Sequence, residues 1–206
     1  YPAVVAWASC PQKGILCLPL TYAPVSFRDE AIEIVKQRGC RTYCHHPIQE
    51  ARHWGIINGE DGAPTYHRTH SCYSVAAFHE ALRILLDYGR TEKAIEYTYH
   101  EKALCQAVEA MGCEVTSNMT SLVVLNLPGK LAGSEKDLVA ACREENFGIW
   151  PTLSSPVQVR IGILNQLNQD AITDIVGRFA DAMLKMGAGF NKEKVMQGLA
   201  EYYSAN

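Results

Sequence analysis

The chain has 206 residues, of which 48% are hydrophobic and 20% are charged, and its formal net charge is -3 at pH 7. This composition is ordinary for a globular protein, and a chain of this length can bury a core without cross-links. A nearly neutral charge without a basic run argues against nucleic acid and anionic membranes as partners. No apolar run approaches the roughly 20 residues that span a bilayer.

Eight cysteines occur, at positions 10, 17, 40, 44, 72, 105, 113 and 142. Most lie inside apolar runs rather than loops, which favours buried free thiols in a reducing compartment over disulfide bonds.

The N-terminal end already has the pattern of structured chain. There is no initiator methionine, and Ala3 to Trp7 reads as a buried strand. We therefore expect a fragment or a processed subunit, with any targeting segment upstream of Tyr1, so the cellular location stays open.

The first third of the chain mixes short strands, one helix and a long loop. Prolines and glycines divide residues 2–27 into short strands joined by tight turns, and Ala23–Phe27 is one such strand. Arg28–Arg38 has the pattern of an amphipathic helix that Gly39 ends. Residues 40–69 show no period, and a loop of that length is commonly functional.

The remaining elements follow from helical or strand periodicity. Helices are predicted at Ser74–Tyr88, Thr91–Met111, 135–146, Asp170–Met186 and 192–203, and strands at Leu122–Leu127, Phe147–Trp150 and Val157–Ile163. Strand and helix alternate, so we expect an α/β fold. We place a domain boundary near residue 105, with residues 1–105 belonging to a larger layered domain and residues 106–206 forming a small α/β domain.

The lysine in Ser9-Cys10-Pro11-Gln12-Lys13-Gly14 is the most distinctive local feature. Lysine is rarely placed directly after a buried strand, and a desolvated lysine is a good amine nucleophile. The alternative is a lysine at a strand end whose amine extends to water.

A second candidate site is Tyr66-His67-Arg68-Thr69, just before a predicted helix. A phenol, a hydroxyl and a cation close to a helix N-terminus suit a phosphate group. The alternative is a polar loop with a helix cap.

The third candidate is Arg160, inside the apolar strand Val157–Ile163. A guanidinium there must be paired or must bind an anion, and its planar fork matches a carboxylate. A structural ion pair, or a position on the solvent face of the strand, is the alternative.

Together these three features resemble the class V aminotransferases that use pyridoxal 5'-phosphate (PLP), and most closely the alanine–glyoxylate and serine–glyoxylate branch. Ser9–Gly14 is similar to that branch's Ser-Gln-Lys-Gly signature, with Cys10 and Pro11 inserted. Tyr66–Thr69 resembles its Tyr-His-x-Thr element, and Val159-Arg160-Ile161-Gly162 resembles its Arg-Ile-Gly element. The similarity spans roughly residues 3–186.

The resemblance implies a PLP-dependent transferase of fold type I, comprising the remainder of the large domain and the C-terminal small domain. It implies that Lys13 forms the Schiff base with PLP and that Gln12 also binds the cofactor. Tyr66 and Thr69 would reach the cofactor phosphate of a neighbouring subunit, and Arg160 would hold the substrate carboxylate.

The implied reaction transfers an amino group between alanine or serine and glyoxylate or pyruvate in a homodimer. The family's residues that contact the pyridine ring and much of the phosphate precede the lysine, so the N-terminal half would be a missing partner of this chain.

Two loops depart from the family pattern. Leu18-Pro19-Leu20 replaces Pro-Pro-Gly, and Trp150–Leu153 replaces a glycine-rich stretch. A 2-aminoethylphosphonate-type transaminase and a non-catalytic homologue therefore remain alternatives.

Two alternatives belong to other classes of protein. One is a zinc-binding module around Cys40, Cys44, His45, His46 and His53. The other is a hydrolase with a cysteine–histidine pair, although no cysteine lies in a recognisable nucleophile turn. The resemblance itself implies no metal site.

Overall fold

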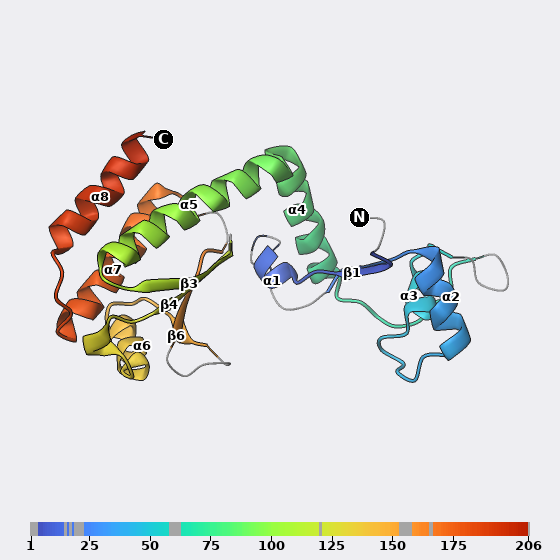
Figure 1. Ribbon diagram of the computed structural model, residues 1–206. Helices are drawn as coiled ribbons and strands as arrows, with labels where there is room; N and C mark the ends of the chain where they lie inside the picture. Colours follow the sequence, from blue (N-terminus) through green and yellow to red (C-terminus); the bar gives the residue numbers. More distant parts are fainter. Residues whose placement is uncertain are drawn as a thin grey trace. The chain divides into compact units, whose positions relative to one another are not determined.

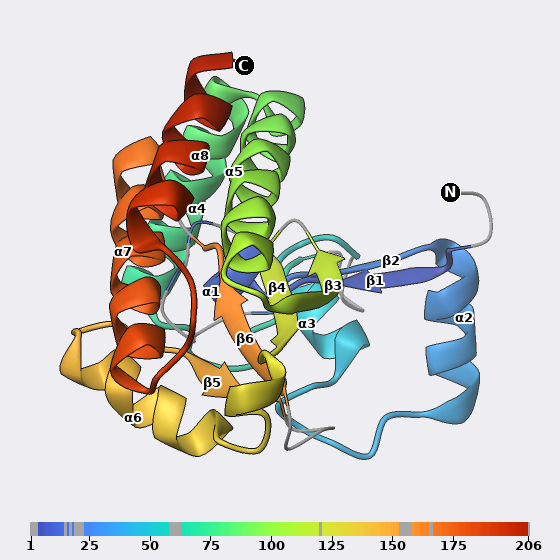
Figure 2. The same ribbon diagram turned by 60° about the vertical axis from the view of Figure 1, so that its left-hand side comes forward.

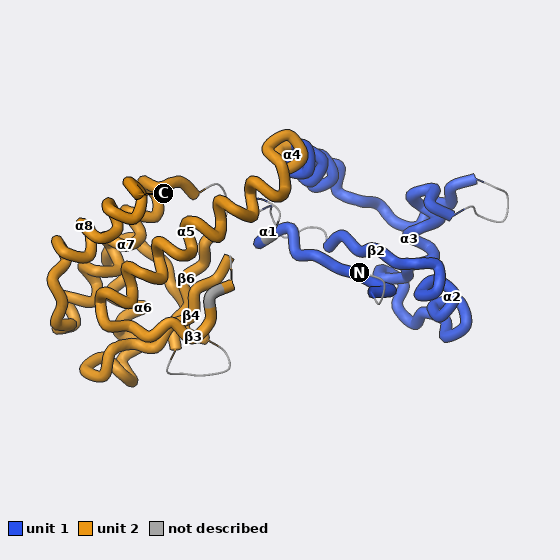
Figure 3. Tube along the Cα trace, turned by 45° about the horizontal axis from the view of Figure 1, so that its top comes forward, with its two compact units in different colours: residues 1–83 blue, residues 84–206 orange. Residues whose placement is uncertain are grey.

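The computed structural model describes residues 4–14, 16, 18, 23–57, 63–119, 121–152, 158–164 and 167–205. Its helices and strands are labelled in Figure 1. The chain divides into two compact units, residues 1–83 and 84–206, which Figure 3 shows in different colours. The domain boundary expected near residue 105 falls inside helix α5 (Arg90–Ala110) and stays a prediction.

The first unit begins with a two-stranded antiparallel ribbon. Strands β1 (Ala6–Ala8) and β2 (Val25–Phe27) pair with Trp7 opposite Ser26. The expected burial of this first strand is wrong for the described residues, since Trp7 is 56% exposed. A ribbon of only two strands cannot bury its own side chains unless another element packs on it.

Three helices complete the described elements that lie wholly in this unit. They are α1 (Pro11–Gly14), α2 (Asp29–Arg38) and α3 (Pro47–His53). Helix α2 matches the prediction, and Gly39 ends it with a φ of +68°, a left-handed conformation that suits glycine. Helix α3 was not predicted. It begins with Pro47, and His46 caps it by accepting a hydrogen bond from the Gln49 amide.

Helix α4 (Cys72–Tyr88) begins in the first unit and ends in the second. Ser71 supports its start, because its hydroxyl oxygen accepts from the Ser74 amide at 3.4 Å. The predicted apolar face of this helix is only half-buried, and Leu86 is 70% exposed.

The second unit is an antiparallel sheet with helices on one face (Figure 2). The strand order is β3 (Glu114–Met119), β4 (Leu122–Asn126), β6 (Gln158–Gly162) and β5 (Trp150–Pro151). The helical elements are α5, the 3-10 turn η1 (Gly129–Leu131), α6 (Glu135–Glu144), α7 (Gln169–Lys185) and α8 (Lys192–Ala205). Helices α5, α7 and α8 pack side by side, and α5 also packs on β3 and β4.

The core of the second unit lies between this helical layer and the sheet. Leu104, Ile172, Phe179 and Met183, which belong to the helices predicted at Thr91–Met111 and Asp170–Met186, are all fully buried there. Strand β3 was missed because its sequence, Glu-Val-Thr-Ser-Asn-Met, has no apolar run. Among the described strands it pairs only with β4, and it carries a bulge between Val115 and Ser117, as an edge strand commonly does.

The seven cysteines in the described part of the chain are free, but they are not generally buried as the sequence analysis expects. Cys113 and Cys142 are buried, Cys40 and Cys105 are partly buried, and Cys10, Cys44 and Cys72 are exposed. Cys17 lies outside the described residues. Within the part of the chain that the structure describes, no helix has the length and apolar character to span a membrane.

Candidate functional site

Lys13 is the third residue of α1, which follows β1 and precedes β2 along the chain. Two backbone hydrogen bonds fix the start of α1: the Ser9 amide, before the helix, donates to the Pro24 carbonyl at 3.0 Å, and the Lys13 amide, inside the helix, donates to the Cys10 carbonyl at 3.2 Å. Pro11, which needs no amide partner, is the first residue of α1 and is buried. The ribbon therefore places Lys13 at a defined position in the first unit.

The side chain of Lys13 is exposed, so the expectation of a desolvated amine is not met by the described residues. Its Nζ lies 3.4 Å from Oε1 of Gln12. No carboxylate among the described residues forms an ion pair with it. The amine is thus open to a ligand and is held near one neutral acceptor.

Tyr66 and Thr69 lie side by side in the loop before α4. The Tyr66 Oη and the Thr69 Oγ1 are 2.6 Å apart, and both side chains are exposed. Helix α4, which has 17 residues, begins three residues after Thr69. Two adjacent hydroxyls beside a helix N-terminus form a donor set that fits a phosphate dianion.

Arg160 lies on the sheet face opposite the helices of the second unit. In β6 its neighbours Val159 and Ile161 are buried, whereas Arg160 is half-exposed, as alternation along a strand requires. No described carboxylate pairs with its guanidinium, which rules out a structural ion pair within the described residues. Across the sheet it pairs in register with Val124 of β4 and Trp150 of β5.

The structure therefore brings the predicted residues together in pairs. Gln12 adjoins Lys13, and Tyr66 adjoins Thr69, all in the first unit, while Arg160 belongs to the second unit. No hydrogen bond joins the two pairs among the described residues.

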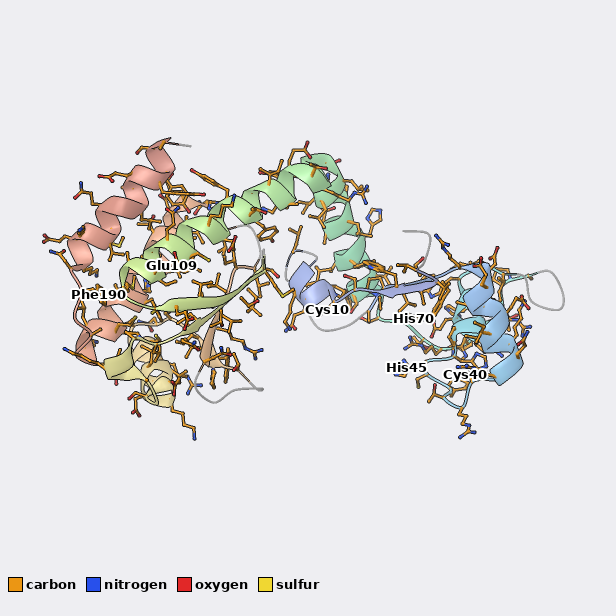
Figure 4. All side chains as sticks on the ribbon, in the orientation of Figure 1. Cys10, Cys40, His45, His70, Glu109 and Phe190 are labelled. Carbon is orange, nitrogen blue, oxygen red and sulfur yellow. The ribbon has the colours of Figure 1, made fainter. Side chains whose placement is uncertain are left out.

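Two of the three histidines proposed as zinc ligands have other partners. His46 caps α3, and the Nδ1 of His53 accepts a hydrogen bond from the His67 amide at 3.0 Å. Cys40, whose thiol contacts Thr42, and His45 are both labelled in Figure 4. No group of three or more ligating side chains among the described residues could hold a metal ion.

The residues around Glu50 were missed by the sequence analysis. Glu50 on α3 is contacted by Arg68 and His70 from the loop that carries Tyr66 and Thr69. No sequence signal singles it out, because an acidic residue on a short helix is usually a solvated surface group.

Neither a family model nor a curated protein matches the chain. Solved structures do share its fold. Ureidoglycine–glyoxylate aminotransferase from Bacillus subtilis matches 98% of this chain and 52% of its own, with a TM-score of 0.84 and 18% identity. Alanine–glyoxylate aminotransferase from Nostoc sp. matches 87% and 48%, with a TM-score of 0.75 and 18% identity. Pyridoxamine–pyruvate aminotransferase from Mesorhizobium loti matches 97% and 52%, with a TM-score of 0.78 and 16% identity.

These likenesses confirm, at the level of the fold, the expected resemblance to class V aminotransferases. The chain has the α/β fold of PLP-dependent transferases of fold type I. It spans about half the length of the structures that it matches.

Proposed function

We propose that the chain supplies part of a PLP-dependent aminotransferase that moves an amino group between a small amino acid and a 2-oxo acid. The observation that supports this proposal best is the fold shared with aminotransferases over nearly the whole chain. Alanine or serine as the donor, and glyoxylate or pyruvate as the acceptor, are the substrates that the resemblance of the three motifs favours.

The residues present suit PLP at its phosphate group and at the position where a lysine would form the Schiff base. Tyr66 and Thr69 offer two exposed hydroxyls within 2.6 Å of each other, which suits a phosphate. Lys13 offers an exposed amine with one neutral acceptor, Gln12, near it. When bound, PLP supplies an electron sink for the bond broken at the substrate α-carbon.

Each residue then has a separate role. The Lys13 amine would hold the cofactor covalently and, once released, would carry a proton at the substrate α-carbon. Gln12 would orient the Lys13 amine through its Oε1. The Arg160 guanidinium would bind the substrate carboxylate in two parallel hydrogen bonds, which its planar fork allows.

The other parts of such an enzyme are proposals about residues outside this chain. We infer that the groups that contact the pyridine ring are encoded before Tyr1. We also infer a homodimer, because the element that Tyr66–Thr69 resembles acts across a subunit interface. Tyr66 and Tyr73 are 70% and 85% exposed, which is compatible with contact to a second copy.

The test is to mix the protein with PLP, reduce with borohydride and map the modified peptide. It is run on this chain and on a version that carries the segment encoded upstream of Tyr1. We expect the label on Lys13 in the longer version, and the Lys13→Ala variant should lose both the label and transamination. Scattered labelling in both versions would contradict the proposal and favour a non-catalytic homologue. Normal transamination by Lys13→Ala would contradict the role of Lys13.

A further inference from the structure

The loop before α4 separates its side chains into two sets. Tyr66 and Thr69 are exposed, and their hydroxyls contact each other. His67 is buried, and Arg68 and His70 are partly buried. His67, Arg68 and His70 therefore anchor the loop. The place where they are held decides where the hydroxyls of Tyr66 and Thr69 lie.

Two aromatic residues hold His67 from the preceding segment. The Tyr43 Oη donates to the His67 carbonyl, and the His67 Nε2 lies 2.9 Å from the Tyr43 carbonyl oxygen. The His67 amide donates to Nδ1 of His53 at 3.0 Å. The His53 ring also lies edge-on to the Tyr66 ring, with centroids 5.6 Å apart. The backbone on one side of Tyr66 is thus fixed to α3 and to the turn before it.

The other side of the loop is held by charge. The carboxylate of Glu50 accepts a hydrogen bond from the Arg68 Nε, and its Oε2 lies 3.2 Å from the His70 Nε2. His67 Nε2 is 3.9 Å from Oε1 of the same carboxylate. Figure 4 labels His70. The Glu50 carboxylate, whose side chain is only 21% exposed, therefore contacts residues that precede and follow Thr69 in the chain.

The balance of forces on Glu50 indicates that it is charged in the folded protein. Burial acts to raise its pKa, but the hydrogen bond and charge of Arg68, with smaller contributions from His70 and His67, lower the pKa below its usual value. A charge-assisted hydrogen bond is roughly twice as strong as a neutral one. Loss of this charge would release Arg68 and His70 together and free the loop near Thr69.

We infer that Glu50 is a positioning residue for phosphate recognition, because it holds the loop that sets the Tyr66 and Thr69 hydroxyls side by side. The inference rests on the proposed function, in which these two hydroxyls bind the cofactor phosphate. Glu50 itself would not contact the phosphate. Its effect should therefore appear only with ligands that carry a phosphate.

The experiment compares binding of PLP with binding of pyridoxal, which lacks the phosphate. It uses unmodified protein of the version, shorter or longer, in which the borohydride test labels Lys13. Glu50→Gln removes the charge and keeps the size of the side chain. Glu80→Gln is the matched control, since Glu80 pairs with Arg83 on the exposed surface of α4 in the same unit. Tyr66→Phe reports the effect of losing one phosphate donor directly. Hydrogen exchange of the 65–70 amides measures the loop without any ligand.

We expect Glu50→Gln to weaken PLP binding by about tenfold, to leave pyridoxal binding within about twofold, and to speed amide exchange in the loop. Glu80→Gln should change none of these quantities. In the double variant, Glu50→Gln should add little to Tyr66→Phe, because both act on the same hydroxyl pair.

Two other results distinguish failure of the positioning role of Glu50 from failure of the proposed phosphate site. If Tyr66→Phe changes the ratio of PLP to pyridoxal affinity and Glu50→Gln does not, the positioning role is wrong and the proposed cofactor site stands. If neither variant changes that ratio, or the protein binds no PLP in any form, the phosphate site itself is wrong and the positioning role fails with it.

Discussion

The hydrogen bond between His100 and Tyr203 joins α5 to α8 in the second unit, and its removal should have a measurable cost. The His100 Nδ1 lies 2.9 Å from the Tyr203 Oη, and His100 is 6% exposed. Tyr203→Phe keeps the ring and removes only the hydroxyl, so it leaves a buried ring nitrogen without this partner. An orphaned buried polar group costs about 1–3 kcal/mol. For a chain of this size that lowers the midpoint of thermal unfolding by roughly 2–12 °C.

The neighbouring tyrosine provides a control. The Tyr202 Oη donates to the Tyr99 carbonyl at 3.1 Å. That carbonyl lies within α5 and has a helical partner, so Tyr202→Phe should cost less than about 1 kcal/mol. Thermal unfolding followed by circular dichroism measures both variants. Equal losses in the two variants, or an unchanged midpoint in Tyr203→Phe, would refute the assignment of this bond as the costly one.

The same histidine predicts a pH dependence. Burial lowers the pKa of His100 more than the nearby Glu96 carboxylate raises it. Because the folded pKa lies below the usual 6.5, the unfolded chain takes up the proton first as the pH falls. The stability that His100 contributes is therefore present above about pH 6.5 and is lost as the pH falls through the folded pKa. His100→Gln should flatten the stability profile in this range, and an unchanged slope would contradict the reasoning.

Three further predictions concern the site and the core. Arg160→Lys should raise KM for the amino acid by about tenfold or more with a smaller change in kcat, and steady-state kinetics with an unchanged KM would argue against a carboxylate site. Phe179→Ala, at a fully buried position of α7, should lower the free energy of unfolding by about 3–5 kcal/mol in urea titrations, and a loss below about 1 kcal/mol would contradict its place in the core. Glu50→Gln should destabilise the protein at neutral pH and not in acid, because a lowered carboxyl pKa adds stability above about pH 4.5 that disappears as the pH falls; equal losses at both pH values would be the opposite result.

The sequence alone determined the helices α5, α6, α7 and α8 of the second unit. Helices α5, α7 and α8 have apolar residues at helical spacing, and a glycine soon follows both α5 and α7, so periodicity and stop signals sufficed. The three short motifs around Lys13, Tyr66 and Arg160 also sufficed to indicate the fold, because their order along the chain is a property of the sequence.

Only the tertiary structure decided how these residues are held. Strand β3 has no apolar run and exists because β4 offers it hydrogen-bond partners. The exposure of Trp7 and of Lys13 depends on which elements cover them, and periodicity does not report that. Glu50 and His67 are 17 positions apart in the chain, yet they meet because α3 and the loop before α4 pack together. Contacts between distant residues depend on how the chain folds back on itself, and local sequence carries no record of that path.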